Sequence, residues 1–167
     1  MFKKLLLASI AALSTMPAMA RVESGTASLM TLLEDNGVQV IVNGEACLGD
    51  MIHGNYTWSG LRRQMNVCVG ESWDATDHET VRHETWHAIQ HCVNSSRGTP
   101  LNTPVVTDMD RLAEYVNKYV PASAVTFVKT SYPENKWLLE IEAQLASIMY
   151  TADDLKPLFK NACTFRM

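Results

Sequence analysis

The sequence lacks several patterns that mark common classes of enzyme. It has no glycine-rich phosphate loop, which argues against a nucleotide site of the P-loop type. It has no G-x-S-x-G nucleophile elbow, and nothing places its serines or cysteines beside a histidine as a catalytic triad. No internal repeat or low-complexity tract is present, so a repeat architecture is not expected.

Positive charge is in short supply. The 14 lysines and arginines are outnumbered by 18 aspartates and glutamates, which gives a net charge of −4. Lys3 and Lys4 lie in the first twenty residues, which contain no acid, so the net charge of the remaining residues is −6. An acidic chain is a poor partner for nucleic acid or for anionic membrane surfaces, and we expect the protein to bind neither.

Long apolar runs are also scarce. The clearest one extends from Leu5 to Leu13, follows two lysines and precedes Ala18-Met19-Ala20. This layout predicts a signal peptide that is cleaved after Ala20, because the apolar run is too short to span a bilayer. We therefore expect a protein that is exported to the periplasm or the medium and is soluble after cleavage. Residues 21–167 have the length of one domain with a substantial core.

The four cysteines include no C-x-x-C pair, which argues against a structural zinc site built from paired cysteines. An even number of cysteines in an exported chain favours two disulfides, and four cysteines allow three connectivities. We favour Cys47–Cys68 across a β-hairpin. We also favour Cys92–Cys163, which would join the last helix of the chain to the helix that contains Cys92.

A small sheet is expected in the first half of the exported chain. Val38–Val42 reads as a strand, and Asn43-Gly44 behind it is a turn signal. Alternate residues between 61 and 69 are largely apolar, which predicts a second strand with one buried face. We expect an antiparallel sheet between about residues 38 and 69.

The rest of the chain has helical periodicity. Thr76 with Glu79 forms a capping-box pattern, which predicts the start of a helix through residues 83–87. The glycine and prolines between 94 and 104 predict a loop. The fold class is therefore α+β, with a small N-terminal antiparallel sheet followed by a mainly helical body. Further helices are expected at 27–35, 107–120, 121–131, 133–150 and 151–163.

The most informative segment is the H-E-x-x-H pentapeptide that starts at His83 and ends at His87. At 100° per residue the two imidazoles lie about 40° apart on one helical face, close enough to share a metal ion. Glu84 between them is placed to take a proton from a metal-bound water. The alternative is a chance pair of surface histidines. The opposite face is apolar and suited to burial: Val81, Thr85, Ala88, Ile89 and Cys92.

A catalytic zinc site normally has a third protein ligand. The H-E-x-x-H-x-x-G-x-x-H extension is absent, so a downstream carboxylate is favoured over another histidine. Glu140 is preferred to Glu142, because Glu140 shares its helical face with short or polar residues, which are Ala143, Gln144 and Ser147. Glu142 lies on a more apolar arc and is a candidate for orienting a histidine ligand. Alternatively, both glutamates are ordinary surface charges.

These residues resemble the gluzincin branch of the zincin metallopeptidases, in which an H-E-x-x-H helix and a later helix with E-x-x-A-(D/N) provide two histidines and one glutamate. The matching residues are His83, Glu84 and His87, then Glu140 with Ala143, whereas Gln144 replaces the usual Asp or Asn. The resemblance implies a zincin-like body with zinc held by His83, His87 and Glu140. It further implies peptide hydrolysis by a zinc-activated water, with Glu84 as general base.

The resemblance leaves two parts of the site open. The donor that stabilises the oxyanion could be any of four residues, which are His91, Tyr115, Tyr119 and Tyr132. The strand between 61 and 69 is a candidate edge strand for docking an extended peptide.

A secreted zinc metallopeptidase is thus the function that we favour, with peptides or proteins as substrates. One alternative is a zinc amidase that acts on cell-wall peptide. The other is an inactive, disulfide-linked binding protein on a zincin-like scaffold, although the intact Glu84 argues against it.

Overall fold

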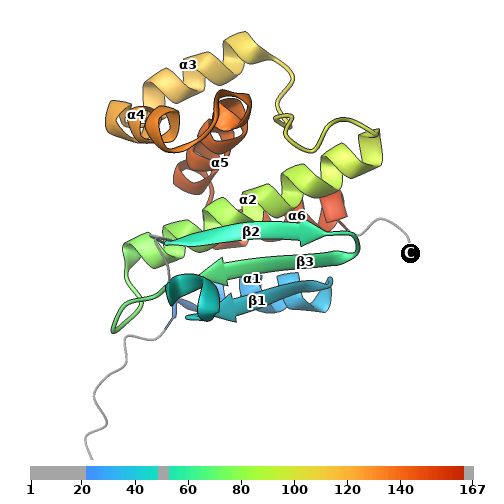
Figure 1. Ribbon diagram of the computed structural model, residues 1–167, viewed down its shortest axis with the longest axis vertical. Coiled ribbons are helices and arrows are strands. Elements are labelled where there is room, and N and C mark those ends of the chain that lie inside the picture. The colour runs from blue at the N-terminus through green and yellow to red at the C-terminus, as the bar shows by residue number, and fades with distance from the viewer. Residues whose placement is uncertain (1–21, 49–52, 164–167) are drawn as a thin grey trace, which may run out of the picture.

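The computed structural model describes residues 22–48 and 53–163 (Figure 1), so the predicted signal peptide and its cleavage site lie outside the described residues. The described residues form a three-stranded sheet and six α-helices, which confirms the α+β class. None of the described helices is long and apolar enough to cross a membrane.

The sheet consists of β1 (Val38–Val42), β2 (Gly54–Ser59) and β3 (Arg62–Val67), in the order β1-β3-β2. Strands β2 and β3 form an antiparallel hairpin, but β1 pairs with β3 in parallel. The prediction of a wholly antiparallel sheet was therefore wrong. After β1 the chain crosses to the far edge of the sheet, where it forms β2, and then returns through the centre as β3. Strand β3 is the most buried of the three, and both of its edges are paired.

The strand predicted between 61 and 69 as a peptide-docking edge corresponds to β3, which is the central strand. Its backbone groups are already paired with β1 and β2, so it cannot accept another strand. Met65 and Val67 on β3 are fully buried, which explains its central place. The two edge strands are β1 and β2.

Helix α2 (Ala75–Arg97) carries the H-E-x-x-H segment along the sheet. Its N-cap is Asp74, whose carboxylate accepts hydrogen bonds from the backbone N–H groups of Thr76 and Asp77. The predicted capping box of Thr76 and Glu79 was therefore wrong by two residues, since an aspartate at 74 supplies the acceptor first. The helix also extends into the predicted loop and ends at Arg97, where Gly98 with a left-handed φ of 67° is the C-cap.

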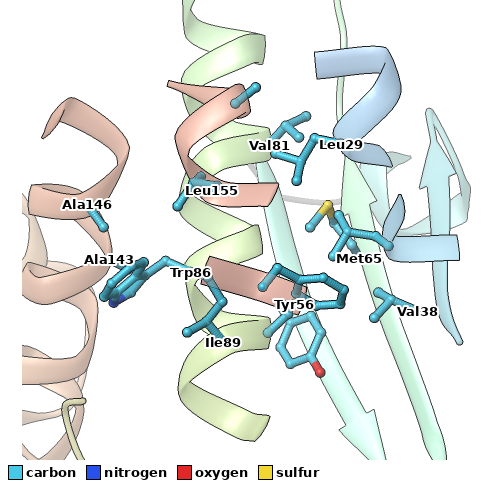
Figure 2. Close-up of a cluster of buried hydrophobic side chains, with 14 of the residues drawn as sticks. Leu29, Val38, Tyr56, Met65, Val81, Trp86, Ile89, Ala143, Ala146 and Leu155 are labelled. Atoms are coloured by element: carbon cyan, nitrogen blue, oxygen red, sulfur yellow. The ribbon is translucent and has the colours of Figure 1, made fainter. Parts of the chain in front are cut away.

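The main core lies between one face of the sheet and helices α1 (Ser24–Asp35), α2 and α6 (Ala152–Cys163) (Figure 1). Side chains from all of these elements meet there (Figure 2), and the apolar face predicted for α2 is buried in this cluster. The predicted start of α6 is confirmed, because Thr151 and Asp154 bond each other reciprocally. Burial of the apolar face turns the opposite face of α2 away from the core.

Both predicted disulfides are present. Cys92–Cys163 joins α2 to α6, as expected. Cys47–Cys68 joins the short 3-10 helix η1 (Glu45–Leu48) to the end of β3. The second link therefore fixes the connection after β1, rather than the two strands of a hairpin.

The remaining helices form a second group beside α2 (Figure 1). They are α3 (Met109–Tyr119), α4 (Ala122–Ser131) and α5 (Trp137–Met149), with the 3-10 helix η2 (Glu134–Lys136) before α5. Helix α5 contacts α2 on one side and both α3 and α4 on the other. A smaller apolar cluster of Leu112, Val120 and Leu145 holds this group together. The position of α5 against α2 creates the candidate site.

Candidate metal centre

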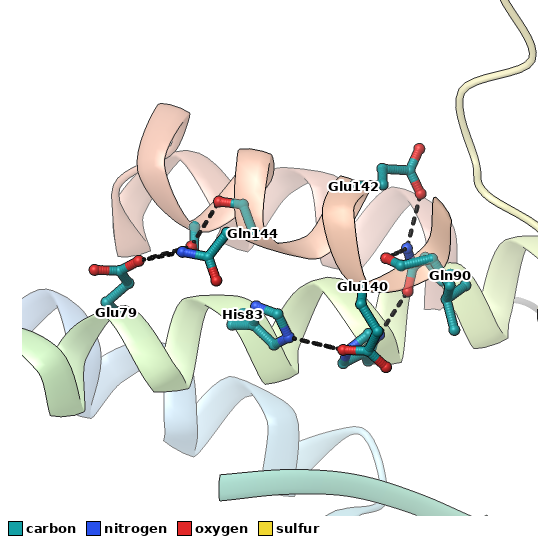
Figure 3. Close-up of polar contacts among 9 residues, drawn as sticks. Glu79, His83, Gln90, Glu140, Glu142 and Gln144 are labelled. Carbon is teal, nitrogen blue, oxygen red and sulfur yellow. Dashed lines mark hydrogen bonds and ion pairs between the residues drawn. The ribbon is translucent and has the colours of Figure 1, made fainter. Parts of the chain in front are cut away.

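Three side chains from α2 and α5 converge on one point (Figure 3). The Nε2 atoms of His83 and His87 are 3.1 Å apart. The Oε2 atom of Glu140 lies 3.4 Å from Nε2 of His83 and 3.2 Å from Nε2 of His87. Two consecutive helical turns thus supply the imidazoles, and the facing helix supplies the carboxylate.

These distances fit a tetrahedral zinc site. Ligand atoms that lie 2.0–2.1 Å from a tetrahedral zinc ion are about 3.3 Å from one another. The three measured separations, 3.1, 3.2 and 3.4 Å, scatter closely around that value. Two imidazoles and one carboxylate are also the donor set of known catalytic zinc sites, which leaves a fourth position open. His83, His87 and Glu140 are therefore the residues that could hold the metal.

The other three histidines are engaged elsewhere or lie apart. His78 is buried and bonds the hydroxyl of Thr26 through its Nδ1 atom. His91 bonds the hydroxyl of Tyr56. His53 lies directly before β2, where it lines the cleft beside His83 without joining the cluster.

Glu140 and the two histidines interact electrostatically. Burial by itself would raise the pKa of Glu140, but hydrogen bonds from His83 and His87 lower this pKa to about 2. Burial would lower the pKa of His87, yet its hydrogen bond to Glu140 and the charges of Glu84 and Glu140 raise it to about 9. The imidazole of His87 and the carboxylate of Glu140 thus stabilise each other's charged forms.

Glu84 lies beside the cluster and is almost completely buried. Its Oε2 atom has no hydrogen-bond partner among the described residues. Burial raises the pKa of this carboxyl group against the opposing charges of His83 and His87. An unpaired buried carboxylate oxygen is costly, and such atoms in native proteins call for a functional explanation.

Glycine at position 54 allows β2 to approach this part of α2. A Cβ atom at Gly54 would lie 2.7 Å from the carbonyl oxygen of Asn66 and 2.7 Å from the methyl group of Thr80. The same Cβ would lie 3.6 Å from the Cγ atom of Glu84. Close packing of β2 on α2 therefore brings the strand to the edge of the site.

A chain of hydrogen bonds orients His87. Its Nδ1 atom donates to Oε1 of Gln90 at 2.7 Å, and Nε2 of Gln90 donates to Oε2 of Glu142 at 2.7 Å (Figure 3). Glu142 also accepts the backbone N–H groups of Val105 and Val106, at 2.9 and 2.6 Å. The bond at Nδ1 leaves Nε2 of His87 to face the cluster. Glu142 thus acts on a histidine as expected, but through Gln90.

Gln90 was not assigned a role from the sequence. The available signal was its position three residues after His87 on the same helical face. The sequence did not reveal that Glu142 on α5 would contact Gln90 and fix the orientation of its amide.

We expect Gln90→Met to weaken zinc binding by about 10- to 100-fold, which is the usual effect of removing a partner that orients a ligand. Methionine keeps the length of the side chain but cannot accept the Nδ1–H of His87. Competition with a chromophoric chelator would measure the affinity. Gln39→Met, the same chemical change on the exposed side of β1, is the control. An unchanged affinity in Gln90→Met would show that His87 is oriented without Gln90.

A cleft of about 540 Å³ opens beside the cluster between α2, the start of β2, the end of α4 and α5. His83, Glu84 and Tyr132 all line it. Burial and the charges of Glu140 and Glu84 raise the pKa of Tyr132 to about 12, so its phenol remains a hydrogen-bond donor. Of the four oxyanion candidates, the structure brings Tyr132 to the cleft.

The other three oxyanion candidates have different surroundings. Tyr115 and Tyr119 stack on each other along α3, and Tyr115 lines a separate pocket. His91 is turned towards Tyr56 and Trp58. These residues are not among those that line the cleft beside His83.

The structure therefore brings the four predicted site residues together: His83, Glu84, His87 and Glu140. Comparisons of the chain with protein-family models, with curated proteins and with solved structures found no match. Any assignment of function consequently depends on the chemistry of this cluster and its cleft.

Proposed function

We propose that the protein is a zinc-dependent metallopeptidase. One observation carries the proposal: three ligand atoms converge at tetrahedral spacing beside a buried carboxylate with an unpaired oxygen. The cleft next to them gives a substrate access to that carboxylate. A structural metal site would need neither the cleft nor Glu84.

Zinc held by His83, His87 and Glu140 would polarise a substrate carbonyl and make a water molecule more acidic. Glu84 then performs the proton transfers. Its unpaired Oε2 atom accepts the proton of the attacking water and returns it to the amine that leaves when the peptide bond breaks. Because the Glu84 carboxylate is fixed by its burial between α2 and β2, it needs little reorganisation during the reaction.

Tyr132 is the donor that we assign to the developing oxyanion. It lines the same cleft as His83 and Glu84, and its phenol is protonated at neutral pH. A neutral O–H donor near the carbonyl oxygen stabilises negative charge that is absent from the ground state.

Strand β2 is the edge along which we place an extended peptide substrate. Its outer edge has no strand partner among the described residues, and Gly54 and Asn55 at its start line the cleft. A peptide that adds to a sheet edge gains backbone hydrogen bonds for any sequence. This placement carries the peptide past His83 and Glu84.

The first test is metal analysis combined with a peptide-library assay. We expect about one equivalent of zinc per chain and hydrolysis that is lost with a chelator and regained on adding zinc. Zinc-loaded protein that cleaves no peptide would contradict the proposal and favour a binding protein. Cleavage of cell-wall peptides alone would favour an amidase.

A further inference from the structure

The cleft contains a second carboxylate, Glu79, that the proposed reaction does not use. Glu79 lies one helical turn before His83, and both residues line the cleft. Its Oε1 atom accepts hydrogen bonds from Nε2 of Gln144 at 2.7 Å and from Oγ of Ser147 at 3.3 Å (Figure 3). Helix α5 therefore fixes the direction of this side chain.

Glu79 forms no ion pair with a lysine or arginine of the described residues. None of the ion pairs among the described residues includes it, and no lysine or arginine is among the described residues that line the cleft. The nearby Arg82 donates through Nε to the backbone carbonyl of Ser147 at 2.9 Å instead. The half-buried carboxylate of Glu79 thus has only neutral hydrogen-bond donors, Gln144 and Ser147, among the described residues.

We propose that Glu79 makes the cleft a binding site for a cationic side chain, lysine or arginine, next to the scissile bond of the substrate. This inference rests on the proposed peptidase function. A carboxylate that is partly removed from water is poorly stabilised by neutral donors alone. A guanidinium or ammonium group replaces the lost contacts of the carboxylate with water by short, charge-assisted hydrogen bonds.

The position of Glu79 sets which substrate residue it recognises. Four residues along a helix span about 6 Å, so Glu79 is one side-chain distance from His83 and the reacting carbonyl. The cleft of about 540 Å³ has room for an extended side chain beside the backbone of a peptide. The recognised residue therefore flanks the cleaved bond directly.

A different role for Glu79 would be purely structural, because its bonds to Gln144 and Ser147 join α2 to α5. The two roles make different predictions. Loss of a structural contact would impair all substrates alike, whereas loss of a cation site would impair only those with a positive side chain.

The test compares peptides that differ only in arginine or citrulline, which has the same shape without the charge. We expect the wild-type protein to cleave the arginine peptide with a kcat/KM that is about 10- to 100-fold higher than its kcat/KM for the citrulline peptide. In Glu79→Gln this ratio should fall to about one, because the amide still accepts from Gln144 but carries no charge. Glu34→Gln removes the same charge from an exposed position on α1 and should keep the ratio.

Two outcomes would overturn the inference. One is a wild-type protein that cleaves both peptides equally well. The other is a Glu79→Gln protein in which kcat/KM falls by the same factor for both peptides, which is the signature of the structural role. If Glu79→Gln does not fold, the ratio of kcat/KM for the two peptides in the wild type still tests the cation site. A Glu79→Asp variant, which keeps the charge, should also keep the preference for the arginine peptide.

A binding measurement separates this inference from the proposed function. Acetyl-arginine amide and acetyl-citrulline amide are titrated into the zinc-loaded protein, and the NMR signals of Gln144 and Ser147 are followed. Shifts caused only by the arginine probe would support the cation site even in a protein that hydrolyses no peptide. No shift with either probe would overturn the cation site, whether or not peptides are cleaved.

Discussion

Glu84→Gln is expected to lower kcat for peptide hydrolysis by about 10²- to 10⁴-fold, while zinc content stays at one equivalent. The amide keeps the size of the carboxylate but cannot take a proton from water. The three ligand atoms belong to His83, His87 and Glu140, so the metal site should survive the change. Metal analysis and steady-state kinetics on the same preparation measure both properties.

The Glu84→Gln variant has a second expected property. It replaces a buried carboxylate, whose Oε2 atom has no partner among the described residues, by an uncharged amide that costs less to bury, so its thermal stability should equal or exceed that of the wild type. Glu34→Gln on α1 serves as the matched control for the lost charge. Wild-type activity in Glu84→Gln would exclude Glu84 as the general base. Loss of zinc together with activity would instead make Glu84 part of the metal site.

Glu140→Gln is expected to lower zinc affinity by more than about 100-fold and to abolish hydrolysis. Loss of a direct ligand should exceed the 10- to 100-fold effect of losing a group that only orients one. An amide is a far weaker ligand for zinc than a carboxylate, so only the two imidazoles remain as strong ligands in the variant. Isothermal titration with zinc gives the affinity directly.

Glu134→Gln is the control for this experiment, because Glu134 is an exposed glutamate in η2 on the same segment. Retention of tight zinc binding in Glu140→Gln would refute the assignment of the third ligand. Glu142 is a poor replacement for it, since both of its oxygens already accept hydrogen bonds from Gln90, Val105 and Val106. Glu142→Gln should therefore destabilise the loop around Val105 more than it weakens zinc binding.

The choice of Glu140 over Glu142 shows how far helical periodicity alone can go. Helical periodicity predicts that Glu140 shares a face with Ala143, Gln144 and Ser147, and that face does pack on α2. Periodicity worked because a helix fixes the direction of each side chain from local geometry. It gave no information on the hydrogen bonds that each side chain would form.

The sheet shows the limit of the same reasoning. Val38–Val42 was predicted with the observed bounds, and the strand between 61 and 69 contains β3. The order β1-β3-β2 and the parallel pairing of β1 were not predicted, because alternation reports which face is buried and not which strand is the neighbour. Consequently, the docking edge was assigned to β3 although β2 is the strand at the cleft.

The sequence by itself determined the local features: the helix that places His83 and His87 on one face and the α+β class. These features follow from spacing and from interactions between residues that are close along the chain. Only the tertiary structure decided that Gln90 joins His87 to Glu142, that Tyr132 lines the cleft, and that Glu79 lies there without an ion-pair partner among the described residues. Such relations depend on how α5 packs across α2, and that packing is set by many weak contacts over the whole core.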